Sequence, residues 1–160
     1  MKKIILLMFF ITFLFKTEYL HSQKFNGYSH IAIEDIEYTD GSLDKYDLTS
    51  KIIKFFKKKG FNTIRLDEDF NYYGGELKTE NDCEILSVEV THDTPRVGYA
   101  TKVYMRFYDC NADEIMKFSG SGMSFSAKGD VNGGLKKILK IVESRMGKYK
   151  FDPNRTPVYN

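Results

Sequence analysis

The sequence predicts an α+β fold in which two helices pack on one face of a mixed five-stranded sheet. Two segments carry apolar residues at helical spacing, and the other ordered segments alternate apolar with polar residues, as strands do. These segments follow each other in the order βαβββα. A chain of 160 residues with 13 Phe and 11 Tyr also has enough apolar volume for one core.

The first three elements form a predicted β–α–β unit. Residues 28–38 (YSHIAIEDIEY) predict a strand, because Ile31 and Ile33 alternate with polar neighbours. Residues 44–59 predict a helix whose apolar stripe is Leu48, Ile52, Phe55 and Phe56. Gly60 ends this helix, and residues 61–66 (FNTIRL) then form a strand parallel to the first through a right-handed crossover.

Residues 84–92 and 99–109 predict a β-hairpin around a turn at residues 95–98. With this turn, opposed residue numbers sum to 193. The apolar pairs are then Leu86 with Phe107, Val88 with Met105, and Val90 with Val103. A shift by one residue would move one apolar set to the solvent side. A shift by two preserves the pattern, so the register stays open by two residues.

The same register predicts a disulfide between Cys83 and Cys110, which lie opposite each other at the open end of the hairpin. Directly opposed residues have Cα atoms about 4.5–5.5 Å apart, which is within reach of a disulfide. The alternative is a pair of buried free thiols.

Residues 114–126 predict the last strand, and residues 131–146 the second helix. Gly120 and Gly122 interrupt the strand and indicate either a bulge or a close approach by another backbone. The buried stripe of the helix is predicted to be Leu135, Ile138, Leu139, Val142 and Met146.

Residues 1–22 have the order of a secretory signal peptide, with Lys2 and Lys3 before an apolar run at residues 4–15. This run is shorter than the roughly 20 apolar residues of a membrane-spanning helix, although an uncleaved anchor remains the alternative. Cleavage after Ser22 would leave a single domain at residues 23–146 and an extended tail at 147–160. We therefore expect an exported protein, periplasmic or associated with the outer membrane of a Gram-negative bacterium.

The charge of the chain argues against a nucleic-acid partner. The whole chain has a formal net charge of +2. The leader carries Lys2, Lys3 and Lys16 against Glu18, which is also +2, so the remainder is neutral. Nucleic-acid binders need a concentrated basic face, and a neutral domain lacks the charge for one.

We expect no catalytic residue, cofactor or metal from the motifs. His30 and His92 have no second His or Cys at the spacing of a metal site. Asp67, Asp69 and Asn71 resemble the start of a calcium loop. The match to a calcium-binding loop fails at two positions. Tyr72 replaces the Gly that turns the chain, and Lys78 replaces the Glu that binds calcium with both oxygens.

Residues 67–82 (DEDFNYYGGELKTEND) form a long connection that predicts a contact surface. Phe70, Tyr72 and Tyr73 lie beside two glycines, and aromatic rings next to flexible glycines are common in contact surfaces. The alternative is that these rings fold back and cap the sheet.

The chain from about Ser29 to Glu143 resembles the amino-terminal α/β domain of TolB-type periplasmic proteins and related small envelope proteins. The matching segments are HIAIEDI (30–36), IKFFKKKGFNTI (53–64), CEILSVEV (83–90) and VYMRFYD (103–109). The chain has no room for the propeller domain of the full-length family. The resemblance implies a non-catalytic role in envelope assembly or protein contact, and it assigns no catalytic residue.

Three functions follow as hypotheses. The first is a non-catalytic interaction module that contacts another envelope protein through the loop around Tyr72 or through an exposed sheet edge. The second is a small secreted hydrolase with a site built from Asp, Glu and either His30 or His92. The third is a carrier with an apolar pocket between the sheet and the helices. The oligomeric state is left open.

Overall fold

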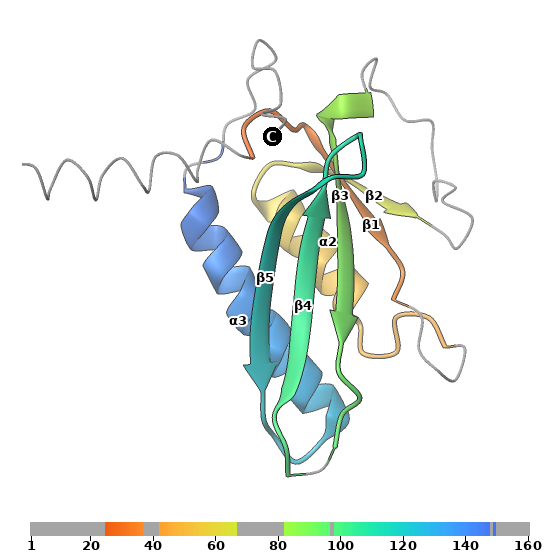
Figure 1. Cartoon of the computed structure of the whole chain (residues 1–160), viewed down its shortest axis with the longest axis vertical. Helices are drawn as coiled ribbons and strands as arrows, with labels where there is room; N and C mark the ends of the chain where they lie inside the picture. The colour runs from red at the N-terminus through yellow and green to blue at the C-terminus, as the bar shows by residue number, and fades with distance from the viewer. Residues whose placement is uncertain (1–24, 37–41, 67–81, 97, 148, 150–160) are drawn as a thin grey trace, which may run out of the picture.

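The structure is a computed structural model that describes residues 25–36, 42–66, 82–96, 98–147 and 149. It contains a five-stranded sheet in the order β2-β1-β3-β4-β5 (Figure 1). The strands are β1 (His30–Glu34), β2 (Asn62–Leu66), β3 (Ile85–His92), β4 (Thr101–Tyr108) and β5 (Glu114–Gly122), and the helices are α2 (Leu48–Lys58), α3 (Ala127–Met146) and the short 3₁₀ helix η1 (Asp82–Glu84). β1 is parallel to β2 and β3, whereas β4 and β5 are antiparallel to their neighbours. The predicted α+β class and element order are confirmed.

The core lies between the sheet and the two helices, which cover the same face (Figure 1). Ile31 and Ile33 of β1 point into this layer, and so does every second residue of β3 and β4. Phe56 of α2 contacts Phe107 of β4 edge to face, with ring centroids 6.1 Å apart. Phe25 packs against Phe107 in the same way at 5.6 Å. Interlocked rings therefore fill the layer that the carrier hypothesis assigns to a ligand.

α2 begins at Leu48, four residues later than the sequence predicts. Asp44 and Asp47 both have positive φ, which is incompatible with helical backbone. The Asp44 carboxylate instead accepts hydrogen bonds from the backbone N–H groups of Thr49 (2.9 Å) and Ser50 (3.3 Å). Asp44 thus satisfies the first orphan donors of the helix from outside it.

α3 begins at Ala127, four residues earlier than predicted, and β5 ends at Gly122 rather than at Ser126. The physical reason is the cap: the Ser126 hydroxyl accepts a hydrogen bond from the N–H of Gly129 at 3.1 Å. Ser124 also donates its backbone N–H to the buried carboxylate of Asp130. The serines that read as strand in the sequence therefore cap a helix.

Gly120 and Gly122 mark a close approach by another backbone, one of the two readings that the sequence leaves open. A Cβ added at Gly122 would lie 1.9 Å from the carbonyl oxygen of Asp130 in α3. One added at Gly120 would lie 2.5 Å from the carbonyl oxygen of Gly134. Only residues without a side chain let α3 pack this closely on β5.

The predicted hairpin register is wrong by two residues, although its parity is right. Val88 pairs with Phe107 and Val90 with Met105, so opposed numbers sum to 195 instead of 193. The cause is the turn, which closes from the N–H of Tyr99 to the carbonyl of Arg96 at 3.1 Å, with Gly98 at positive φ. This turn is displaced by one residue from the predicted 95–98, and a displacement by one changes the sum by two.

The predicted disulfide is present. Cys83 and Cys110 are joined, with Cα atoms 4.8 Å apart. Neither cysteine lies in the β3–β4 ladder, because Cys83 belongs to η1 and Cys110 lies in the turn after β4. The pairing therefore survives the register shift, since both residues lie in connections at the same end of the hairpin.

Candidate functional site

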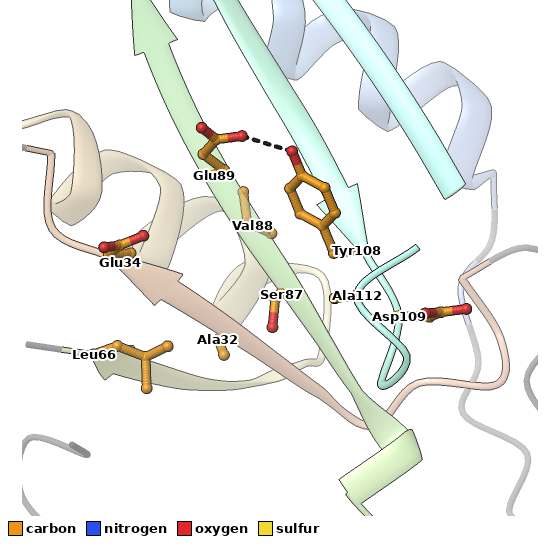
Figure 2. Close-up of a pocket in the computed structure, with 9 residues that line it drawn as sticks. All are labelled: Ala32, Glu34, Leu66, Ser87, Val88, Glu89, Tyr108, Asp109 and Ala112. Atoms are coloured by element: carbon orange, nitrogen blue, oxygen red, sulfur yellow. Dashed lines mark hydrogen bonds between the residues drawn. The ribbon is translucent and has the colours of Figure 1, made fainter. Parts of the chain in front are cut away.

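The face of the sheet opposite the helices, which we call the open face, carries a hollow of ≈ 360 Å³ (Figure 2). It spans β2, β1, β3 and the end of β4. Its lining consists of Ala32, Glu34, Leu66, Ser87, Val88, Glu89, Tyr108, Asp109 and Ala112. Ala32 and Leu66 form its apolar floor and pack against Ile85 and Ile64 beside it. Carboxylates and hydroxyls therefore surround a small apolar patch.

Glu34 and Glu89 are neighbours on adjacent strands at the rim of this hollow (Figure 2). Two hydrogen bonds hold the Glu89 carboxylate in place: its Oε2 accepts from the hydroxyl of Tyr108 (2.7 Å) and from Nη1 of Arg106 (3.1 Å). Partial burial, with a smaller contribution from the charge of Glu89, raises the pKa of Glu34 above its ordinary value. Two adjacent carboxylates in unequal environments are the groups that a general acid and base would need.

The two histidines of the hydrolase hypothesis lie at opposite ends of the sheet. His30 begins β1 beside Ile85, and His92 ends β3 seven residues further along. A strand rises about 3.3 Å per residue, so roughly 23 Å separates them. Neither lines the hollow at Glu34. One site therefore cannot contain both histidines.

His30 belongs to a hydrogen-bonded chain that differs from a catalytic triad. The Ser29 hydroxyl donates to Oε2 of Glu84 (2.9 Å), and Nδ1 of His30 lies 2.7 Å from the same hydroxyl oxygen. Because the serine proton goes to Glu84, His30 must donate to serine rather than accept from it. Burial lowers the pKa of His30, and the charge of Glu84 opposes this. In a triad the histidine stands between serine and carboxylate and accepts the serine proton.

His92 has a structural environment. Its Nδ1 lies 2.8 Å from the carbonyl oxygen of Asp93, and its ring centroid is 6.0 Å from that of Tyr46. Among the residues that the structure describes, no group of three or more His, Cys, Asp or Glu side chains is placed to hold a metal ion.

Exposed apolar side chains gather at one end of the sheet, which we call the turn end. Here β3 and β5 finish and β4 begins. Tyr99 lies in the β3–β4 turn and is 71% exposed, while Met123 and Phe125 lie between β5 and α3 and are 74% and 104% exposed. Leu43 is 40% exposed in the connection before α2, and this connection reaches the same end because the ring of its Tyr46 lies 6.0 Å from that of His92 at the end of β3. Four of the five exposed large apolar residues in the described chain thus lie in three neighbouring connections.

Sequence reasoning missed the turn end because it assigned Met123 and Phe125 to a strand. An available signal was the spacing of Ser124 and Ser126 just before the glycines of α3, since serines favour helix N-caps over strand interiors. The predicted contact residues Phe70, Tyr72 and Tyr73 lie outside the described residues.

No helix in the described part of the chain has the length and apolar character to cross a membrane.

Comparisons with known proteins give few matches. No protein-family model matches the chain, and no curated protein matches it. Among solved structures, it is similar to a PelC dodecamer from Paraburkholderia phytofirmans, with 12% identity, a TM-score of 0.47, and coverage of 75% of this chain and 87% of that one. It is also similar to a putative neuraminyllactose-binding hemagglutinin homolog from Helicobacter pylori, with 12% identity, a TM-score of 0.35, and coverage of 74% and 78%. Likeness at this level assigns neither family nor function.

Proposed function

We propose that this protein is an exported, non-catalytic interaction module of the cell envelope that contacts another envelope protein through the turn end. The observation that carries the proposal is the exposure of Tyr99, Met123 and Phe125 on a well-packed domain. Neighbouring exposed apolar side chains on soluble proteins commonly mark interaction sites, because burying them against a partner removes apolar surface from water. Tyrosine and phenylalanine are also enriched in interfaces.

Two further features support an exported location in this proposal. The leader at residues 1–22 has the order of a signal peptide. The Cys83–Cys110 disulfide is typical of proteins from oxidising compartments. The resemblance to the amino-terminal domain of TolB-type proteins is part of the proposal and points to the same envelope role.

The hydrolase remains a second candidate because of one observation, the raised pKa of Glu34 beside Glu89. Its site would be the open-face hollow rather than either histidine. Replacing Glu34 with Gln should abolish any hydrolysis if this candidate is right. A binding module should be indifferent to the same change, since Glu34 lies away from the turn end.

The test is capture from a Gram-negative envelope extract with the chain from residue 23 onward as bait. We expect a defined partner that is retained by wild type and lost by the triple variant Tyr99→Ser, Met123→Ser, Phe125→Ser. Lys57→Ser is the control, because Lys57 is exposed in the last turn of α2, away from the turn end. Equal capture by wild type and the triple variant, or loss with the control alone, would contradict the proposal.

A further inference from the structure

β5 presents unused backbone hydrogen-bonding groups along the outer edge of the sheet. The carbonyl of Lys102 in β4 accepts from the N–H of Asp93 at 2.9 Å, so the peptide groups of Lys102 point toward β3. Along an antiparallel strand, the N–H and C=O groups of successive residues point alternately to one neighbouring strand and to the other. Val103 and Met105 therefore point toward β5 and pair with Gly120 and Phe118.

Gly120 and Phe118 of β5 therefore point toward β4. The residues between and beside them point the other way, away from the sheet: Lys117, Ser119 and Ser121. Lys137 of α3 covers one of them by donating from Nζ to the carbonyl oxygen of Ser121 at 2.6 Å. Lys117 and Ser119 are exposed, and β4 is the sole neighbour of β5 among the described strands. Their N–H and C=O groups thus form a short open template for another strand.

The surroundings of this edge differ on its two sides. On the helix side, Phe118 is partly buried against the core. Lys137 contacts the position of Gly120, and Ile141, one helical turn further, is 39% exposed. On the open face, the ammonium group of Lys117 lies 5.8 Å from the ring centroid of Tyr104. The edge therefore has an apolar flank on one side and a positive charge on the other.

We propose that the β5 edge binds an extended segment of a partner protein, which adds to the sheet as a sixth strand. The segment would carry apolar side chains at alternate positions, facing Phe118 and Ile141, and acidic side chains at the others, facing Lys117. Main-chain hydrogen bonds supply affinity in strand addition, and alternate side chains supply specificity. This inference goes beyond the proposed function, since it uses a different surface from the turn end.

Charge argues for a partner segment over a second copy of this chain. Two β5 edges brought together would place Lys117 and Lys137 of one copy near the same residues of the other, and like charges across adjacent strands are unfavourable. An acidic segment instead gains from Lys117 on the open face. The other edge strand, β2, has five residues against nine in β5 and offers a shorter template.

The probe is the hexapeptide acetyl-Asp-Val-Asp-Val-Asp-Val-amide, titrated into the chain from residue 23 onward and followed by amide NMR. We expect the amide signals of Lys117 and Ser119 to shift and to become protected from exchange. The matched peptide with Lys in place of Asp should bind at least about tenfold more weakly, a difference of about 1.4 kcal/mol.

Substitutions at Ser119 isolate the backbone contribution. Ser119→Pro removes an N–H that points outward and breaks no bond to β4, whereas Ser119→Ala keeps that N–H. We expect Pro to weaken the hexapeptide at least tenfold and Ala to leave it within twofold. If the Pro variant fails to fold, two hexapeptides, one N-methylated at its valines and one at its aspartates, make the same test on the wild-type chain, because one of these two sets of N–H groups faces β5 in either strand orientation.

Several outcomes would overturn the inference. Equal binding by the Pro and Ala variants, or by the plain peptide and both N-methylated peptides, would remove the backbone template. Shifts confined to β2 or to the turn end would assign the peptide elsewhere. Dimerisation seen by sedimentation and lost in Ser119→Pro would assign the edge to a second copy. Phe125→Ser should leave peptide binding unchanged, so failure of the proposed function would not be mistaken for failure here.

Discussion

The two ends of this sheet are built in opposite ways. The end that holds Cys83 and Cys110, which we call the disulfide end, is tied by a covalent bond and by Tyr149, whose ring stacks on Phe61 with centroids 3.8 Å apart. The hydroxyl of Tyr149 also donates to the carbonyl oxygen of Tyr28 at 2.6 Å. At the turn end, by contrast, Phe125 is fully exposed. Cross-links and buried aromatic rings fix one end, and the other presents apolar side chains to solvent.

The exposure at the turn end does not come from loose packing beneath it. α3 starts at this end and approaches β5 so closely that a Cβ added at Gly122 would collide with the backbone of Asp130. Val103 lies against Gly134 in the same layer. The exposed side chains of the turn end are therefore attached to closely packed elements. Little backbone order has to be gained on binding, which keeps the entropy cost low.

The largest expected effect comes from Gly122→Val, which tests this close packing. A side chain at Gly122 would collide with the backbone of α3, so the helix must move away from the sheet. We expect a loss of about 4 kcal/mol or more in the free energy of unfolding, measured by urea denaturation.

Gly98→Ala is the control for that change. A Cβ at Gly98 meets nothing within 4 Å, but its φ of +80° is unfavourable for alanine. The expected loss is about 1 kcal/mol, from backbone strain alone. Equal losses in the two variants would show that close packing of α3 is not what holds the turn end.

The disulfide end should respond next most strongly, to the double variant Cys83→Ser, Cys110→Ser. The bond closes a loop with a sequence separation of 27. Such a loop stabilises by about 3.5 kcal/mol in the chain-entropy model. Thermal unfolding with and without reductant checks this, because a reductant should lower the melting temperature of the wild type and leave the variant unchanged. No effect of reductant on the wild type would contradict a stabilising bond.

The sequence was sufficient for the layers of this fold and insufficient for its connections. Alternation in β3 and β4 gives the right buried face, because a strand side must be apolar throughout to join the core. The register also depends on the position of the turn. That position depends on whether Pro95 or Gly98 occupies a central position of the turn. Gly98 at positive φ determines it. That choice is made by local backbone geometry, which apolar patterning does not report.

The candidate site was harder to predict than the fold for a related reason. Glu34 and Glu89 are far apart in sequence and meet only because β1 lies beside β3. The exposure of Phe125 depends on β5 ending at Gly122 and on Ser126 capping α3. Aromatic residues in an apparent strand are ordinarily assigned to the core. The sequence pattern alone therefore predicts a buried ring at Phe125, whereas the ring is exposed.

A smaller effect is expected from Tyr149→Phe, which keeps the ring on Phe61 and removes one hydrogen bond. The loss at pH 8 should be about 1 kcal/mol, as for a typical buried hydrogen bond. Burial also raises the pKa of Tyr149 above that of an unfolded tyrosine. Its stabilising contribution is therefore complete below about pH 10 and falls as the pH rises above that value.

Denaturation at pH 8 and pH 11 separates the two contributions of Tyr149. Between these values the wild type should lose more stability than the variant, by up to about 1.4 kcal/mol for each pH unit above 10. If the two proteins lose stability equally, Tyr149 ionises as freely in the folded chain as in the unfolded one. The tie at the disulfide end would then rest on the disulfide and the ring stack alone.

The smallest effect on stability is expected at the turn end, from Phe125→Ser. Its ring is fully exposed, so its removal changes little buried area, and the free energy of unfolding should stay within about 0.5 kcal/mol of wild type. The matched change Phe61→Ser at the disulfide end removes a buried ring and should cost about 3 kcal/mol or more. A large loss from Phe125→Ser would mean that this ring packs on its own domain. Stability unchanged together with lost partner capture is the combination that a contact residue requires, because an exposed ring adds little to the stability of its own domain and buries its area only against a partner.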